Sequence, residues 1–324
     1  RGLGDGLCAR CGAPRKAAGA RMMGYALITS EQGYAAGVQE QPAASLLADV
    51  SGNPCFGAPA MENLLKCPDA LTAMPLAAIT KADAPWSQQP GCSGTALEPA
   101  AWTCYWGKGK PSRVVALVGD SHAEHWRGAV HRIAKAKNWR VIEMFAGGCP
   151  ATLASSVVFE NRPRSGDVCS KWTTKATAKL KALAPDDIIT TAYVQKNVFE
   201  PADSGPAGFE RVWREWLTFS RVTVVRDIPT TGNRNGPQCL AVNALKPQAC
   251  SNPRSKVLVD DDMMRAARAM RRQVNLVDLS DHFCDARRCY AVIGRSGIYY
   301  DADHMSQQYS ATLAQALLFR LPRA

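Results

Sequence analysis

The pattern of hydrophobic and polar residues changes near residue 113. From there onward, short apolar runs alternate with longer segments in which apolar residues recur at helical spacing. Continuous apolar runs of this length are typical of strands that are buried on both faces. Strands that alternate with helices predict an α/β fold, in which helices cover both faces of a parallel sheet. The five predicted strands span residues 114–118, 140–145, 187–192, 221–226 and 274–279.

Helices are predicted between these strands and after the last one. They span residues 122–137, 171–183, 209–219, 257–272 and 306–320, and Ser306 is the expected N-cap of the last. Residues 229–256 are rich in Pro, Asn and Gly, which predicts an inserted loop. Ligands bind at the carboxyl ends of the strands in parallel sheets, so reactive side chains are expected directly after the predicted strands.

The chain before residue 113 lacks this periodicity. Residues 1–47 are rich in Gly, Ala and Gln and are interpreted as a linker or arm. Residues 48–111 contain four cysteines with many Pro and Gly, which indicates a disulfide-linked extension. Residues 112–324 form the predicted catalytic domain. Whether the extension folds separately or packs against that domain stays open.

Ten of the twelve cysteines fall in pairs that are close along the chain. An even number of closely spaced cysteines favours disulfides formed in an oxidising compartment, and hence an extracytoplasmic location. Zinc binding is the alternative, but only Cys8 and Cys11 have a two-residue gap, and no second such pair or nearby His completes a site. The state of Cys8 and Cys11 stays open. The expected disulfide pairs are Cys55/Cys67, Cys92/Cys104, Cys149/Cys169, Cys239/Cys250 and Cys284/Cys289.

The formal net charge of +11 decides little about function. The basic residues are spread along the chain without the Lys/Arg clusters and interleaved aromatic residues of a nucleic-acid interface, so nucleic acid is excluded as a partner. A basic surface suits an anionic envelope polymer, although solubility explains it equally well. No stretch approaches the roughly 18 uninterrupted apolar residues of a membrane span. The basic N-terminal segment is the kind of linker that follows a membrane anchor, so the full-length protein is expected to be tethered.

The first predicted strand ends in Gly119-Asp120-Ser121-His122. A serine on a tight strand-to-helix turn exposes its hydroxyl, and its own N–H lies near a helix N-terminus that can stabilise an oxyanion. Gly119 permits the sharp turn. The alternative is that Asp120 and Ser121 only cap the helix. The tetrapeptide therefore makes Ser121 a candidate nucleophile.

A second motif, Asp301-Ala302-Asp303-His304, precedes the last predicted helix. An Asp three residues before a His can accept a hydrogen bond from Nδ1 of the imidazole, which leaves Nε2 free to accept a proton. Asp303 could replace Asp301, but neighbouring residues of an extended loop point apart, so Asp301 is favoured. Both motifs are expected at the same edge of the sheet, which predicts a Ser121–His304–Asp301 triad.

These motifs resemble those of the SGNH hydrolase superfamily. Gly119-Asp120-Ser121-His122, followed by Gly147-Gly148-Cys149-Pro150, resembles in particular the extracytoplasmic SGNH domain that is fused to membrane acyltransferase-3 proteins, which O-acetylate cell-surface polysaccharides. The resemblance covers about residues 112–322. It implies a three-layer α/β/α, flavodoxin-like fold with a five-stranded parallel sheet.

The resemblance also implies roles for individual residues. Ser121 would form the acyl-enzyme, His304 would be the general base, and Asp301 would orient it. The oxyanion hole would consist of the N–H groups of Ser121 and Gly148, with Gly119, Asp120 and His122 supporting the motif. The family's third block supplies an Asn to that hole, but residues 190–195 contain none and Asn197 is displaced. No cofactor is expected, and no metal either, since His122 and His125 lack acidic partners at matching spacing.

Three functions agree with this sequence. The first is transfer of an acyl group, expected to be acetyl, to an envelope glycan, with the acyl donor delivered by a membrane acyltransferase-3 domain. The second is a secreted carbohydrate esterase that uses the same triad with water as acceptor. The third is an inactive glycan-binding module, which the intact Ser121, Asp301 and His304 disfavour.

Overall fold

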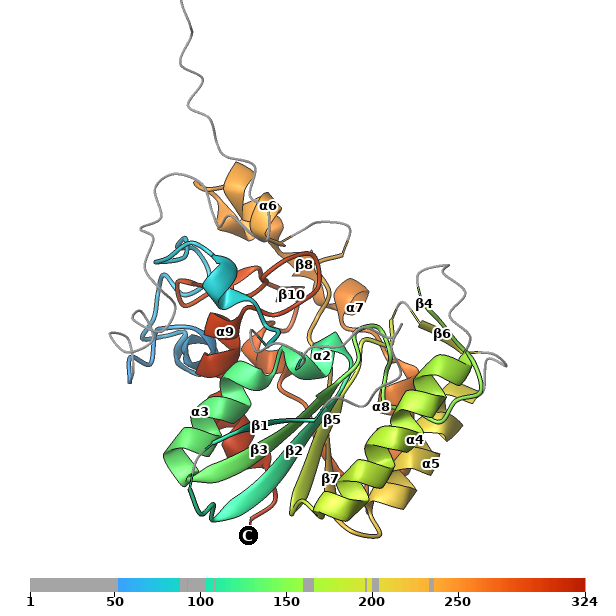
Figure 1. Ribbon diagram of the computed structural model, residues 1–324. Helices are drawn as coiled ribbons and strands as arrows, with labels where there is room; N and C mark the ends of the chain where they lie inside the picture. The colour runs from blue at the N-terminus through green and yellow to red at the C-terminus, as the bar shows by residue number, and fades with distance from the viewer. Residues whose placement is uncertain are drawn as a thin grey trace, which may run out of the picture.

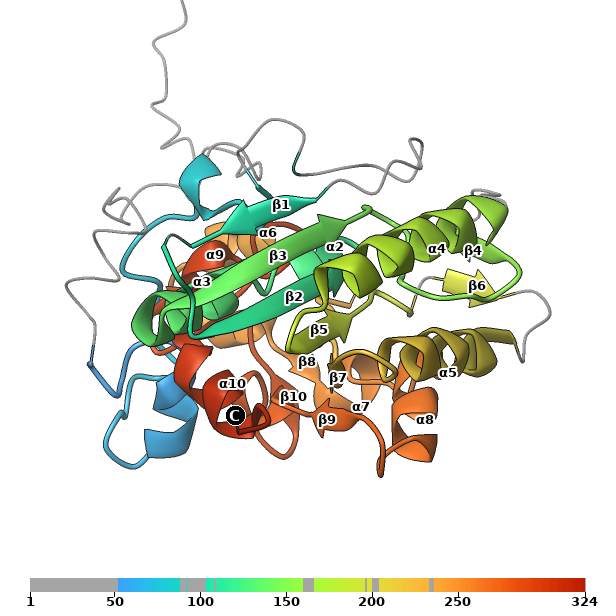
Figure 2. The same ribbon diagram turned by 60° about the horizontal axis from the view of Figure 1, so that its bottom comes forward.

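A six-stranded, mostly parallel sheet forms the centre of the protein. The computed structural model describes residues 52–87, 92, 103–107, 109–159, 166–195, 197–199, 204–232 and 236–323, so the predicted linker and Cys8 and Cys11 lie outside the described residues. The strand order is β1-β3-β2-β5-β7-β9 (Figures 1 and 2). All five predicted strands are confirmed, and they are parallel. They are β2 (Arg113–Gly119), β3 (Trp139–Phe145), β5 (Asp187–Thr191), β7 (Arg221–Val225) and β9 (Asn275–Val277).

The sixth strand, β1 (Cys104–Trp106), pairs antiparallel with β3 at the edge of the sheet. It belongs to the segment that the sequence assigned to the extension. The five parallel strands, numbered along the chain, have the order 2-1-3-4-5, which is the flavodoxin-like arrangement. The strand order reverses beside β2, and Gly119 at its carboxyl end pairs with Phe145 on one side and Thr191 on the other. A crevice for ligands is expected at this point of the sheet.

Two helical layers cover the sheet, as expected for the α/β/α fold (Figures 1 and 2). Alternate residues of β2 face opposite layers: Val115 and Leu117 join one core cluster, whereas Ala116 and Val118 join the other. The first layer contains α3 (Arg127–Lys137), α9 (Gln307–Thr312) and α10 (Ala314–Arg320). The second contains α4 (Gly166–Leu183), α5 (Ser204–Trp216) and α8 (Asp262–Ala269).

Several predicted helices are divided in the structure. The helix predicted at 122–137 consists of α2 (Ser121–Glu124) and α3, separated by His125 and Trp126, whose side chains are fully buried. Packing of these two large side chains, rather than helical periodicity, therefore directs the chain between α2 and α3. The helix predicted at 306–320 is divided into α9 and α10 at Leu313, and the one predicted at 257–272 is shorter, as α8. Ser306 caps α9 as expected, because its Oγ accepts a hydrogen bond from Tyr309 N at 3.1 Å.

The prediction of a loop over residues 229–256 was wrong in part. This insertion contains α6 (Gly236–Val242), η3 (Pro247–Cys250), β8 (Asn252–Pro253) and α7 (Arg254–Val257). Its disulfide, Cys239–Cys250, stabilises short elements that have little periodicity of their own. The remaining elements are short: η1 (Ala58–Asn63), η2 (Lys81–Asp83), β4 (Val157–Phe159), β6 (Asn197–Phe199), η4 (Ser280–His282), β10 (Arg288–Cys289), β11 (Val292–Ile293) and β12 (Ser296–Gly297).

Residues 52–87, which belong to the predicted extension and not to the predicted linker, pack against the α/β body. This segment is the N-terminal arm. Gly57 N donates a hydrogen bond to Gly294 O at 2.9 Å, and Leu76 N donates one to Arg295 O at 2.8 Å. Ala58 N donates to the Thr312 hydroxyl at 3.0 Å. Buried residues of the arm share the core cluster of α3, α9 and α10; they are Ala58, Ala60, Cys67, Ala70, Ala78, Ile79 and Ala84.

All five expected disulfides are present: Cys55–Cys67, Cys92–Cys104, Cys149–Cys169, Cys239–Cys250 and Cys284–Cys289. Each joins residues at most 20 positions apart, so each strengthens one local segment rather than linking distant parts of the chain. Within the described residues, no helix combines the length and the hydropathy that a bilayer span requires.

Candidate active site

Ser121 begins the turn that leaves β2 at its carboxyl end. Gly119 has a φ of 154°, and a Cβ at this position would lie 2.5 Å from the Thr191 carbonyl oxygen and 2.6 Å from the Ala123 Cβ. A side chain at residue 119 would therefore force β2 and β5 apart. Glycine here lets α2 start directly at the edge of the sheet, with the Ser121 side chain half-buried.

Asp120 joins α2 to the end of β5. One carboxylate oxygen caps α2 by accepting a hydrogen bond from His122 N at 2.9 Å, and the other accepts one from Tyr193 N at 2.9 Å. Burial raises the pKa of this carboxyl group, while the nearby His122 opposes the rise. Asp120 thus connects the chain after β2 with the chain after β5 through these two hydrogen bonds.

The structure brings Ser121 and the Asp301/His304 pair together, although they lie far apart in the sequence. Nε2 of His304 lies 2.8 Å from the Ser121 Oγ. Nδ1 of the same imidazole lies 3.0 and 2.9 Å from the two carboxylate oxygens of Asp301. Asp301 Oδ1 also accepts hydrogen bonds from the backbone N–H of Asp303 at 3.1 Å and of His304 at 2.8 Å, so its position is determined by the turn itself.

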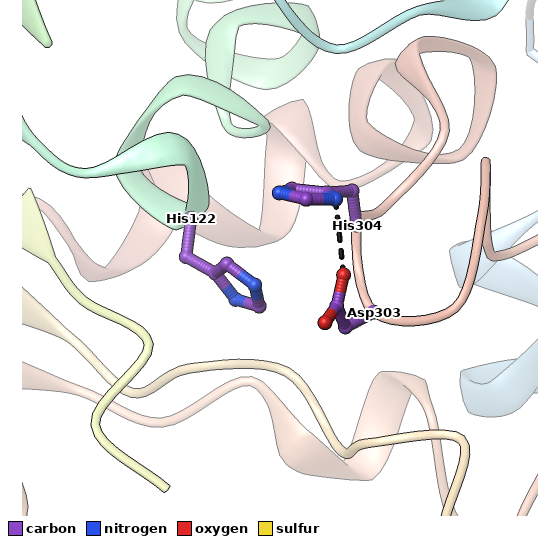
Figure 3. Close-up of side chains that lie close together, drawn as sticks. All are labelled: His122, Asp303 and His304. Atoms are coloured by element: carbon purple, nitrogen blue, oxygen red, sulfur yellow. Dashed lines mark ion pairs between the residues drawn. The ribbon is translucent and has the colours of Figure 1, made fainter. Parts of the chain in front are cut away.

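Asp303 does not point away from the imidazole, contrary to expectation. Its Oδ1 lies 3.0 Å from Nδ1 of His304 (Figure 3). Residues 301–304 form a tight turn rather than an extended segment, because Asp301 binds two backbone N–H groups of that turn. Two carboxylates therefore share one imidazole N–H.

The two carboxylates dominate the protonation of His304. Burial lowers the pKa of this imidazole, but hydrogen bonds and charge from Asp301 and Asp303 outweigh burial and raise the pKa to about 10. An imidazole in this environment favours its protonated form, which both carboxylates stabilise. His304 could accept a proton from Ser121 Oγ only in those molecules whose His304 imidazole is deprotonated.

Gly148 lies in a turn that is hydrogen-bonded to Gly119 at the carboxyl end of β2. Ala146 N donates a hydrogen bond to Gly119 O at 3.0 Å, and Cys149 N donates one to Ala146 O at 2.8 Å. Gly148 has a φ of 73°, which a turn residue in this position requires and which glycine adopts freely. The Cys149–Cys169 disulfide ties the turn to α4. The turn with the Gly148 N–H thus lies beside the end of β2, where the predicted oxyanion hole would form.

The block from which the resemblance implied a third donor, residues 190–195, contains no Asn. Tyr193, in the block that carries Asn in the family, stacks on the His122 imidazole with ring centroids 4.2 Å apart and an interplanar angle of 1°. Asn197 belongs to β6 and pairs with Phe159 of β4, in a two-stranded sheet outside the main one.

Sequence reasoning missed Asp227, which is buried at the end of β7. Its Oδ1 lies 2.9 Å from Nδ1 of His122 and also accepts a hydrogen bond from Ile228 N at 2.8 Å. The available signal was its position directly after the predicted strand 221–226, where reactive side chains were expected. Nearby His125 is fully buried, and burial lowers its pKa well below the usual value, so it is neutral.

Two groups of described residues bring potential metal-ligating atoms within 4.8 Å of one another: His122, Asp303 and His304, and His122, His125 and Asp227. In the first group, His304 is hydrogen-bonded to Ser121 and to Asp301. In the second group, His122 is hydrogen-bonded to Asp227. A cation in the first group would have to displace these hydrogen bonds, and neither group is assigned as a metal site.

The N-terminal arm also reaches the site. The ring of Trp86 packs edge-on against Tyr300 at 5.0 Å and against His304 at 5.8 Å between centroids. Ser87 N donates a hydrogen bond to the buried Glu124 carboxylate of α2 at 2.8 Å. The arm thus covers one side of the His304 imidazole, a contribution that the composition of residues 48–111 did not indicate.

Comparison with known proteins identifies the family of this chain. The family model described as "SGNH domain (fused to AT3 domains)" matches residues 91–319, and so begins earlier than the expected residue 112 and includes β1. The periplasmic domain of the lipopolysaccharide acetyltransferase of Salmonella ser. Paratyphi A has a similar fold, with a TM-score of 0.52 at 12% sequence identity over 71% of this chain and 92% of that one. A search of curated proteins found no significant match. The matched region contains Ser121, Asp301 and His304 and most of the chain, and the protein therefore belongs to the family of SGNH domains fused to AT3 domains.

Proposed function

We propose that this protein transfers an acyl group, in its simplest form acetyl, to a hydroxyl of a cell-envelope glycan through an acyl-enzyme on Ser121. The observation that carries the proposal is the continuous hydrogen-bonded series from Ser121 Oγ through His304 to Asp301, at 2.8 and 2.9 Å. This series is the arrangement by which a hydroxyl becomes a nucleophile. Membership of the SGNH family supports acyl transfer or ester hydrolysis in general.

In the first half-reaction, Nε2 of His304 takes the proton of the Ser121 hydroxyl while Oγ attacks the acyl carbonyl. The bond between Oγ and the acyl carbon forms, the bond from that carbon to the donor breaks, and His304 returns the proton to the leaving group. The N–H groups of Ser121 and Gly148 would stabilise the oxyanion. In the second half-reaction, a glycan hydroxyl gives its proton to His304 and attacks the acyl carbon. The new ester bond to the glycan forms, the bond between Ser121 Oγ and the acyl carbon breaks, and His304 returns the proton to Oγ.

The acyl donor in this proposal is presented by an AT3 membrane domain, in the same chain or in another. The family description supports this assignment, because its SGNH domains are fused to AT3 domains. Five disulfides support an oxidising, extracytoplasmic location, at the cell surface or in the periplasm, with the full-length protein tethered to the membrane. The lipopolysaccharide acetyltransferase with a similar fold supports an envelope glycan as acceptor.

Hydrolysis of a chromogenic acetyl ester, with and without a sugar oligomer, tests the proposal. Ser121→Ala should abolish turnover. Ser220→Ala should leave turnover unchanged, because Ser220 directly precedes β7 and so lies at the amino ends of the parallel strands, whereas Ser121 lies at their carboxyl ends. Acetyl found on the sugar by mass spectrometry supports transfer, and acetate alone supports the esterase. If neither variant nor wild type turns the ester over, labelling by a fluorophosphonate decides whether Ser121 is activated. Labelling of Ser121→Ala equal to that of wild type would contradict the proposal.

A further inference from the structure

A groove lies between the N-terminal arm and the helical layer that contains α3, α9 and α10. It has a volume of about 590 Å³, and the described residues that line it include none of the proposed triad. Thr312 of α9 joins the two sides, because its hydroxyl accepts a hydrogen bond from Ala58 N of the arm at 3.0 Å. Small side chains leave the space open, among them Ala58, Ala311, Ala314 and Ala316. Sites for small ligands have volumes of about 300–1,000 Å³, so this arm groove is large enough for one.

The arm groove presents an aromatic ring to water. Phe319 of α10 lines it and is 82% exposed, although large apolar side chains are usually buried. Gln315 lies one helical turn earlier on the same face of α10, and Asn63 lines the groove from η1 of the arm. An exposed ring can pack against the apolar face of a sugar ring, while amide groups can both donate and accept hydrogen bonds from sugar hydroxyls.

The charged side chains of the arm groove are mostly basic. Arg132 of α3 and Arg320 of α10 line it, together with one exposed acid, Glu62 of the arm. Oε1 of Glu62 lies 3.6 Å from Nε2 of His282, which also lines the groove. Two guanidinium groups and one carboxylate leave an excess of positive charge. Guanidinium groups bind carboxylates and phosphates through two parallel hydrogen bonds, so the groove suits an anionic ligand.

We propose that the arm groove is a second binding site for the acceptor, and that it takes a segment of an acidic glycan. The anionic group, a carboxylate or a phosphate, lies against Arg320, and a sugar ring packs on Phe319. The inference rests on the proposed function in that the ligand is part of the glycan that Ser121 would modify. Since α9 follows the His304 turn and ends at Thr312 in the groove wall, a polymer held there stays attached near the catalytic turn between transfers.

Isothermal titration calorimetry with two pairs of sugars tests the inference. Trigalacturonate is compared with neutral maltotriose, and glucose 6-phosphate is compared with glucose. The charged member of at least one pair should bind more tightly than the neutral member, and its affinity should decrease as the salt concentration rises. The pair with the larger difference identifies the anionic group as carboxylate or phosphate. Equal affinities within both pairs, or no binding of any of the four sugars, would overturn the inference.

Substitutions in the arm groove locate the binding. Phe319→Ala and Arg320→Gln should each lower the affinity for the charged sugar about tenfold, and both residues are exposed, so the fold should be retained. Leu245→Ala, at an apolar residue of the insertion that is 97% exposed, and Arg271→Gln, after α8, are the matched controls and should leave the affinity unchanged.

The charge of Glu62 gives a test of opposite sign. Glu62→Gln removes a negative charge from the arm groove and should raise the affinity for the charged sugar about fivefold. A lower affinity in Glu62→Gln would contradict the inference, as would unchanged affinity in both Phe319→Ala and Arg320→Gln. Calorimetry needs no turnover, so these results are separate from the Ser121→Ala assay. A failed ester assay together with the expected binding would reject the proposed function alone.

Discussion

Trp86 of the N-terminal arm packs its ring edge-on against the His304 imidazole, with centroids 5.8 Å apart and an interplanar angle of 88°. The same ring contacts Tyr300, whose N–H donates a hydrogen bond to the His304 carbonyl at 2.8 Å. Trp86 thus contacts both ends of the turn that carries His304, the proposed base. The arm is part of the site, although it contributes none of the three residues of the proposed triad.

Trp86→Ala should lower kcat/KM for ester turnover by about tenfold, while Trp86→Phe should retain most of it. The reason is that a loss of about 1.4 kcal/mol in the positioning of a catalytic group costs a factor of ten in rate. Steady-state kinetics of both variants measure the effect. Trp106→Ala is the control: Trp106 stacks on His131 at 4.6 Å, away from Ser121, and its loss should reduce stability with little effect on the rate of the folded enzyme.

Gly119→Ala should impair folding and turnover together. The new Cβ would meet the Thr191 carbonyl at 2.5 Å, and the φ of 154° disfavours an L side chain, so a loss of stability of about 1–3 kcal/mol is expected. Thermal unfolding and ester kinetics measure the two effects. Gly109→Ala provides a matched comparison, because Gly109 also has a positive φ, 74°, but nothing lies within 4 Å of its Cβ position. Equal effects of the two substitutions would contradict the steric argument.

The activity of this enzyme should increase toward alkaline pH. The carboxylates of Asp301 and Asp303 outweigh burial and raise the pKa of His304 to about 10, and only deprotonated His304 can accept the Ser121 proton. Below that pKa, kcat/KM should rise about tenfold per pH unit. Asp303→Asn should move this rise in kcat/KM to lower pH, because one carboxylate no longer favours the imidazolium. An apparent pKa near the ordinary histidine value of about 6.5 in the wild-type kcat/KM profile would contradict the raised pKa of His304.

The same pKa has a consequence for stability. The folded protein binds the His304 proton more tightly than the unfolded chain does, since the pKa rises from 6.5 to about 10 on folding. The resulting stabilisation is fully present below about pH 6.5 and is lost as the pH rises through about 10. Urea unfolding at pH 7 and pH 10 should therefore show a decrease that is smaller in Asp303→Asn.

The Cys149–Cys169 disulfide should matter for catalysis as well as for stability. It ties the turn that contains Gly148 to α4, so replacing both cysteines by Ser should lower stability by about 2–4 kcal/mol and also slow turnover of the folded enzyme. Replacing Cys55 and Cys67 by Ser removes a disulfide of the arm that is remote from this turn, and it should affect stability alone. Denaturant unfolding and ester kinetics of both double variants distinguish the two roles.

The local sequence pattern was sufficient to predict the parallel strands and the disulfides of this protein. The five parallel strands follow from their apolar runs, and the five disulfides follow from cysteine spacing, because both depend on residues close in sequence. The Gly119–His122 and Asp301–His304 motifs were also visible. They could be expected to meet, since both adjoin the carboxyl edge of one sheet.

Tertiary packing decided the features that join distant segments. Asp227 reaches His122 because β7 and β2 end at one edge with β5 between them, and no local pattern specifies which side chains meet there. Asp303 turns toward His304 because Asp301 binds the backbone of the turn. Trp86 and β1 take their places through packing and pairing with residues far along the chain. Periodicity reports the face that a residue buries, whereas its partner is chosen by long-range contacts that form only in the folded chain.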